Sequence, residues 1–160
     1  MSDDFPLPSA VRTAPREEAP LMADFGQYRD RMLGMVPHIR AIGMTLEAVW
    51  RGHAVVRVPF DPRFVGNPGT GVIHGGVITT ILDNVSGIAV AASASASSMF
   101  QTATLDLRID YMRPATPHEP IYAHAECVRT TRAVAFVKGT AYNLDGDDPI
   151  AMSTGAFMIG

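Results

Sequence analysis

Cysteine is almost absent from this chain of 160 residues, with Cys127 the only example. One cysteine cannot build an internal disulfide framework, and this usage fits a reducing compartment. No basic stretch followed by an apolar run opens the chain, which therefore lacks the pattern of a secretory signal. The longest apolar stretch, from Ile88 to Ala96, is interrupted by serine and is too short to span a membrane. These absences predict a cytoplasmic protein with no membrane partner.

Basic clusters are also missing. The chain has 13 basic and 16 acidic residues, a formal net charge of -3, which argues against a nucleic-acid partner. No second histidine or cysteine stands at metal-ligand spacing from His74, so neither a metal site nor a cofactor is expected. The remaining histidines are expected on the surface or in strands: His38, His53, His118 and His124.

The length suits one domain with a full hydrophobic core, and 47% of the residues are hydrophobic. Four prolines among small and charged residues predict a mobile N-terminal arm over residues 1–20, ahead of a domain over 21–160. A helical repeat of apolar residues predicts a short helix over about 21–36, ended by Gly34 and Pro37.

From Met44 the apolar period changes to two residues, which is typical of strands. Alternation over 45–50 and 53–59, with Arg51-Gly52 between, predicts a hairpin with a tight turn. A loop rich in glycine and proline follows. Four more runs have a strand-like pattern: 102–112, 121–129, 133–143 and 150–159.

Between the two sets of strands lies an apolar stretch with a helical period, from Ile78 to Ala92, directly after His74-Gly75-Gly76. It is apolar around most of its circumference, so it should form a core helix. Asp83 is its only charged residue. A carboxylate there must be hydrogen-bonded, held neutral or used in chemistry. One sheet must wrap this helix to bury it, which makes the fold class α+β.

These motifs resemble a known family. The residues that carry the resemblance are Asn67-Pro68, His74-Gly75-Gly76, Asp83-Asn84 and the run 105–115, which contains Tyr111-x-Arg113-Pro114. From Met44 onward the chain is similar to hotdog-fold acyl-CoA thioesterases of the phenylacetate-degradation type, within the 4-hydroxybenzoyl-CoA thioesterase superfamily. The resemblance implies an antiparallel sheet wrapped around one long central helix, and hydrolysis of an acyl-CoA to a free acid and CoA.

The resemblance also implies roles for individual residues. The family acid corresponds to Asp83, as general base or nucleophile, and the Gly75 amide would polarise the thioester carbonyl. Asn67 would help to position the carbonyl or the water, although the family asparagine usually lies one residue closer to the histidine. The Thr104 hydroxyl would help to hold the water.

Helix geometry limits how these groups can work together. Thioester hydrolysis needs an activated oxygen and a donor aimed at the developing oxyanion, and a helix N-terminus supplies such donors. Eight helical residues separate Gly75 from Asp83, which is roughly 12 Å. Two subunits must therefore contribute to one site if both groups act in it. We expect a homodimer, or a homotetramer built as a dimer of dimers.

Several neighbouring residues have open roles. His74 either orients the site through its ring or contacts the substrate directly. Gly76 and Thr79 are candidates for substrate or CoA binding, and Thr79 shares a helix face with Asp83. Arg113 either contacts a CoA phosphate or lies in solvent at its strand end. Two other functions remain open: a hotdog hydroxyacyl-thioester dehydratase, and a non-catalytic acyl-CoA-binding protein.

Overall fold

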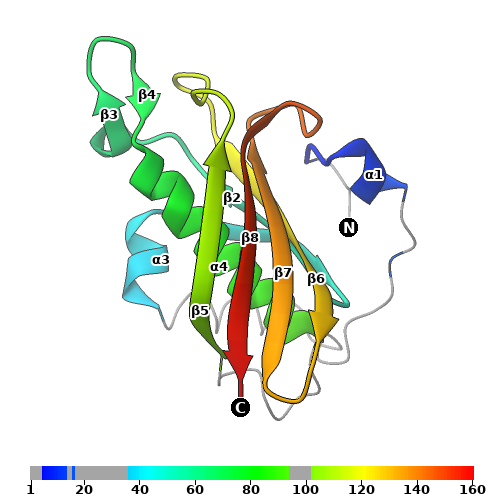
Figure 1. The fold of residues 1–160 in the computed structure, drawn as a ribbon. Helices are drawn as coiled ribbons and strands as arrows, with labels where there is room; N and C mark the ends of the chain where they lie inside the picture. Colours follow the sequence, from blue (N-terminus) through cyan, green and yellow to red (C-terminus); the bar gives the residue numbers. More distant parts are fainter. Residues whose placement is uncertain (1–4, 14–15, 17–35, 94–101) are drawn as a thin grey trace.

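The computed structural model describes residues 5–13, 16, 36–93 and 102–160. Within these ranges, a six-stranded antiparallel sheet curves around helix α4, Gly75–Ser93 (Figure 1). The strand order is β1-β2-β6-β7-β8-β5, so the hairpin β1-β2 and strand β5 form opposite ends of the sheet. The strands are β1 Thr45–Trp50, β2 His53–Val58, β5 Thr102–Tyr111, β6 Ile121–Thr130, β7 Val134–Tyr142 and β8 Pro149–Ile159. This confirms the predicted α+β class, and the predicted strands agree with it to within a residue or two.

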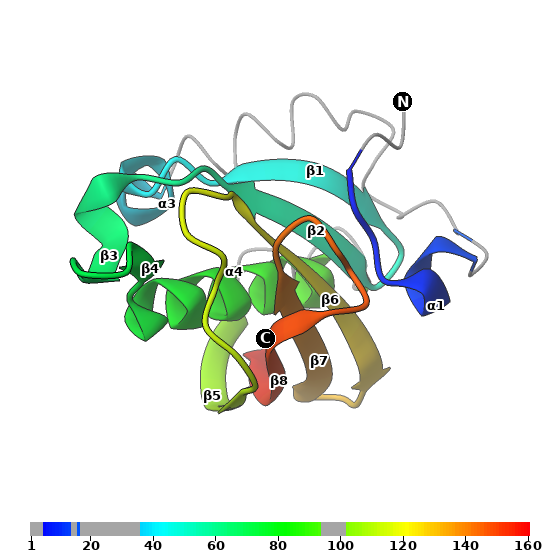
Figure 2. The same ribbon diagram turned by 90° about the horizontal axis from the view of Figure 1, so that it is seen from above.

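Helix α4 lies in the hollow of the sheet when the molecule is viewed from above (Figure 2). By length and hydropathy it could cross a membrane, but in this fold it is the core helix. Ile81, Leu82 and Val85 are fully buried against the sheet. One face stays partly or fully open, and it includes Gly76, Thr79, Asp83 and Gly87. The expectation of burial thus holds for most of the helix circumference but not for this stripe.

The glycine-rich loop before α4 contains structure that the sequence pattern does not reveal. A two-stranded hairpin joins β3, Val65–Asn67, to β4, Val72–Ile73, after a short 3-10 turn, η1 Pro62–Phe64. A Cβ on Gly66 would lie 2.8 Å from the Cα of His74. Glycine is therefore required there, because the hairpin backbone passes directly over the histidine that precedes the helix.

Predictions for the N-terminal part have mixed outcomes. The helix predicted over about 21–36 falls almost wholly outside the described residues, and the short helix α3, Pro37–Ala41, starts just after it. The mobile arm over residues 1–20 stays a prediction, and the structure places residues 5–13 of it against the domain. Leu7 is only 2% exposed and packs with Trp50 and Val55. The segment continues into helix α1, Ser9–Arg12.

Hydrogen bonds fix this segment in place. The hydroxyl of Tyr142 donates to the carbonyl of Pro6 at 3.0 Å, and Ser9 donates from both its amide and its hydroxyl to Asp147. A single well-placed leucine and these polar contacts replace the apolar periodicity on which the arm prediction relied. The position of this segment thus depends on one side chain and on distant hydrogen-bond partners, which composition does not reveal.

Candidate active site

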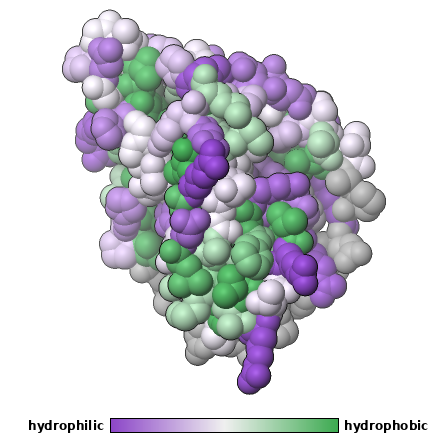
Figure 3. Space-filling view, in the orientation of Figure 1, coloured by the Kyte–Doolittle hydropathy of each residue, from purple (hydrophilic) through white to green (hydrophobic). Residues whose placement is uncertain are grey.

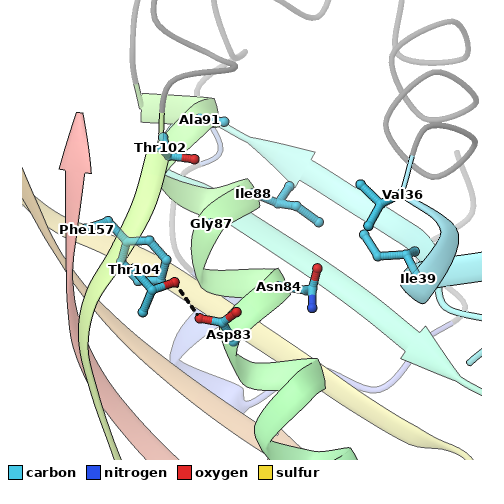
Figure 4. Close-up of a pocket in the computed structure, with 10 residues that line it drawn as sticks. All are labelled: Val36, Ile39, Asp83, Asn84, Gly87, Ile88, Ala91, Thr102, Thr104 and Phe157. Atoms are coloured by element: carbon cyan, nitrogen blue, oxygen red, sulfur yellow. Dashed lines mark hydrogen bonds between the residues drawn. The ribbon is translucent and has the colours of Figure 1, made fainter. Parts of the chain in front are cut away.

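A carboxylate and a hydroxyl from different elements meet on the open face of α4. Asp83 lies in the middle of the helix, and Thr104 lies near the start of β5. The Thr104 hydroxyl donates to Oδ1 of Asp83 at 2.7 Å (Figure 4). This hydrogen bond fixes the orientation of the carboxylate. One carboxylate oxygen is thus held in place while the other stays available.

A cavity of about 260 Å³ begins at this pair and runs along α4 towards its C-terminal half. Its polar end contains Asp83, Asn84 and Thr104, and Figure 4 shows the Asn84 side chain turned away from Asp83 towards α3. The rest of its lining is mainly apolar: Val36, Ile39, Gly87, Ile88, Ala91, Thr102 and Phe157. The cavity therefore combines one oriented carboxylate with space for an apolar group.

The second part of the candidate site is the N-terminus of α4. Nδ1 of His74 accepts the amide hydrogen of Gly76 at 2.9 Å, and the His74 carbonyl accepts that of Val77 at 3.0 Å. His74 thus caps the helix with its own ring, which supports the orienting role. Within the described part of the chain, no acceptor takes the Gly75 amide hydrogen. The amide can therefore donate to a group from outside the helix.

Tyr111 holds this helix end against β5, and the sequence reading did not assign it a role. Its hydroxyl donates to the Gly75 carbonyl at 2.7 Å and lies 2.9 Å from the Thr79 hydroxyl. Its ring also packs over Gly75, since a Cβ there would lie 3.4 Å from the ring carbons. The Tyr-x-Arg-Pro motif was the available signal. Thr79 also bonds the Gly75 carbonyl, at 3.3 Å.

Two candidate residues make contacts within the chain. Oδ1 of Asn67 accepts the Gly69 amide at 3.0 Å, which shapes the loop between β3 and β4. Arg113 forms an ion pair with the Asp148 carboxylate at 2.8 Å and donates to the Asp148 carbonyl. Arg113 therefore links the loop between β7 and β8 to the end of β5. A CoA contact for Arg113 stays a prediction.

The structure thus brings together some predicted residues and separates others. Asp83 and Thr104 line one cavity, whereas Gly75, His74 and Asn67 lie at the N-terminal end of the helix and do not line it. Among the described residues, no three histidine, cysteine or acidic side chains form a metal-binding group.

A curved antiparallel sheet around one long helix is the hotdog fold. The carboxylate on that helix, held by a hydroxyl, is its candidate hydrolytic site. The model of the thioesterase superfamily matches residues 70–150, and the chain belongs to this family. The protein is a thioesterase.

Similar proteins agree with this assignment. The Escherichia coli (strain K12) protein named medium/long-chain acyl-CoA thioesterase YigI is 29% identical over 136 residues, covering 78% of this chain and 86% of that protein. A crystal structure from Pseudomonas aeruginosa is 42% identical, with a TM-score of 0.72, over 82% of this chain and 96% of that one. The Escherichia coli PaaI protein from the phenylacetic acid degradation operon shares the fold, with a TM-score of 0.72 at 17% identity, over 84% and 91%.

Proposed function

We propose that this protein hydrolyses an acyl-CoA with an apolar acyl group, using Asp83 of one subunit and the Gly75 amide of another. The observation that carries the proposal is the placement of the two groups on one helix. Asp83 is held by Thr104 at a cavity, and the free Gly75 amide lies about 12 Å away along the helix. Each helix therefore contributes Asp83 to one site and the Gly75 amide to another.

The chemistry follows from these two halves. The free oxygen of Asp83 either takes a proton from water, which then attacks the thioester carbon, or attacks that carbon itself. In the first route a C–O bond forms to water, the C–S bond breaks, and Asp83 passes its proton to the departing sulfur, so CoA leaves as the thiol. The Gly75 amide donates to the carbonyl oxygen, where negative charge develops. In the second route the C–S bond breaks as Asp83 attacks, CoA leaves as the thiolate and an anhydride forms; one water then opens the anhydride, which restores the Asp83 carboxylate, and its proton passes to the CoA sulfur.

Two exposed surfaces support the view that a second copy of the chain supplies the missing group of each site. Strand β5 is the edge of the sheet, and most of its side chains are exposed on both faces. The open stripe of α4 lies beside it. A long unpaired edge strand invites pairing with another chain. Pairing β5 with its copy around a two-fold axis would cover both surfaces and bring the two α4 helices together in opposite directions.

The apolar part of the cavity supports the choice of acyl group. It extends from Asp83 along Gly87 and Ile88 to Ala91, with Phe157 on the opposite wall. An acyl chain whose carbonyl lies at Asp83 would follow this path. The relative YigI, named as acting on medium and long acyl chains, supports the same class of substrate.

Complementation tests the shared site. Asp83→Asn subunits and Gly75→Val subunits are purified separately, mixed under conditions that exchange subunits, and assayed for release of free CoA thiol. Each homodimer should be nearly inactive. A mixed dimer holds one site with both lesions and one with neither, so about half of normal activity per mixed dimer should return.

A matched control uses the same lesions in one chain. Subunits that carry both substitutions, mixed with wild-type subunits, should place one lesion in each site of the mixed dimer and abolish its activity. If exchange is demonstrated by mass spectrometry and the separate lesions restore no activity, the shared site is wrong.

A further inference from the structure

The docked N-terminal segment encloses a second cavity, on the face of the sheet opposite α4. Along β2, Ala54 and Val56 pack into the core around α4, whereas Val55 packs with Leu7 on the other face. Figure 2 shows α1 outside the sheet on this side. The cavity has a volume of about 510 Å³, within the usual range for small-molecule sites. It is lined by Pro8, Ala10, Val11, His53, His124, Glu126, Lys138, Gly139, Thr140 and Met152.

Two stacked histidines form one wall of this cavity. Nδ1 of His53 lies 3.1 Å from Nε2 of His124, and both rings stack with Trp50, with centroids 4.9 and 5.9 Å from the indole. His124 is 5% exposed. Burial lowers the pKa of His53 and lowers that of His124 to about 3. The pair is therefore neutral near pH 7, and one proton occupies the contact between the rings. Its outer nitrogens then offer one donor and one acceptor.

A charged pair supplies further donors. Nζ of Lys138 lies 3.0 Å from the Glu126 carboxylate. An ammonium group has three donors, and this contact uses one of them. Lys138 is also the only lysine in the sequence. The Thr140 hydroxyl adds another donor on the same strand, β7.

The remaining lining is apolar and comes from two sides. Pro8, Ala10 and Val11 of the N-terminal segment lie across from Met152 of β8. Apolar walls with a few placed polar groups are the usual composition of a small-molecule site. The Lys138 ammonium keeps two unused donors, and Thr140 and the histidine pair each add one, so a ligand group that accepts several hydrogen bonds at once fits this polar wall. An ionised carboxylate has that property.

From this arrangement we infer that the cavity between α1 and the outer face of the sheet binds a small organic acid, with its carboxylate at Lys138 and its apolar body against α1 and Met152. The site lies on the opposite face of the sheet from Asp83, and it does not depend on the proposed reaction. Occupancy would tie the N-terminal segment to β7 and β8 through the ligand.

The single tryptophan makes the inference testable, because Trp50 stacks on both histidines of this wall. Octanoate is titrated into the Asp83→Asn protein while tryptophan fluorescence is recorded. A saturable change is expected. Lys138→Met removes the charge and Ala10→Phe fills the cavity, so each should weaken the affinity for octanoate at least tenfold. Lys138→Arg keeps the charge and should retain the affinity for octanoate.

Two controls separate this site from general effects. Arg132→Met removes an exposed cation between β6 and β7 and should leave the titration unchanged. Octanamide, which has the same chain without the charge, should bind at least tenfold more weakly than octanoate. The inference is overturned if no saturable change occurs, if octanamide matches octanoate, or if Lys138→Met and Ala10→Phe leave the affinity unchanged. Because Asp83 is absent throughout, none of these results bears on the hydrolytic proposal.

Discussion

The hydroxyl of Thr104, near the start of β5, donates to the carboxylate of Asp83, in the middle of α4, at 2.7 Å. The two residues are 21 positions apart in the sequence. Their contact orients the one acidic side chain on the central helix, and it joins the edge strand to the open stripe of that helix. We therefore expect a change at either residue to alter the geometry of the candidate site.

Asp83→Asn should lower kcat at least about a hundredfold, because the amide can neither accept a proton nor attack the thioester. The side chain keeps its size and an oxygen for Thr104, so the melting temperature should change little. Steady-state kinetics with an acyl-CoA and thermal unfolding measure the two effects. Turnover near the wild-type value in a folded mutant would remove Asp83 from the mechanism.

Thr104→Val should lower kcat by roughly ten- to a hundredfold, since a hydrogen bond to a charged group contributes about 1.5–3 kcal/mol. Thr104→Ser keeps the hydroxyl and should restore most of the rate. The role is positioning, so KM should change less than kcat. Equal rates for the valine and serine variants would show that the hydrogen bond is not needed.

The absence of a side chain at Gly87 should allow long acyl chains to bind, so a larger residue there should limit the chain length. Among the residues that the structure describes, a Cβ at this position would meet only a ring carbon of Phe157, at 3.8 Å, so alanine fits without displacing them. Gly87→Leu should reduce kcat/KM for long acyl chains far more than for short ones, because its side chain enters the cavity. Gly87→Ala is the matched control, with a smaller shift. A uniform loss across acyl-CoA lengths would place the acyl chain elsewhere.

Leu7→Ala should destabilise the fold by about 2–5 kcal/mol, the usual cost for a buried leucine. The side chain is buried against Trp50 and Val55, although it lies in a segment whose composition suggested mobility. Urea unfolding followed by tryptophan fluorescence measures the change. Ala10→Ser, an exposed site on the same segment, should change stability by less than about 0.5 kcal/mol. An equal effect of both would contradict the docking.

His124 should make stability fall as the pH falls. Burial lowers its pKa to about 3 in the folded protein, from 6.5 in the unfolded chain. Between these values the unfolded chain binds a proton that the folded protein does not. Each pH unit below 6.5 therefore costs up to about 1.4 kcal/mol. His124→Gln stays neutral and should have a shallower dependence in urea unfolding at pH 6.5, 5.5 and 4.5. Parallel curves for the two proteins would exclude the histidine as the cause.

The sequence by itself determined the six strands of the main sheet, the central helix and the candidate catalytic carboxylate. A period of two residues specifies strands with one buried face, and a long apolar stretch of helical period can be buried only inside a curved sheet. The start of this helix after His74-Gly75-Gly76 was also predictable from the sequence. Asp83 stood out because no other charge lies on that helix.

Only the tertiary structure decided which distant residues meet. The contacts of Asp83 with Thr104 and of Gly75 with Tyr111 depend on how β5 is placed along α4, which no local pattern encodes. Leu7 is similar, because its burial depends on a surface formed by Trp50 and Val55. Periodicity describes how one element presents its faces, whereas these contacts depend on the packing of elements far apart in the chain.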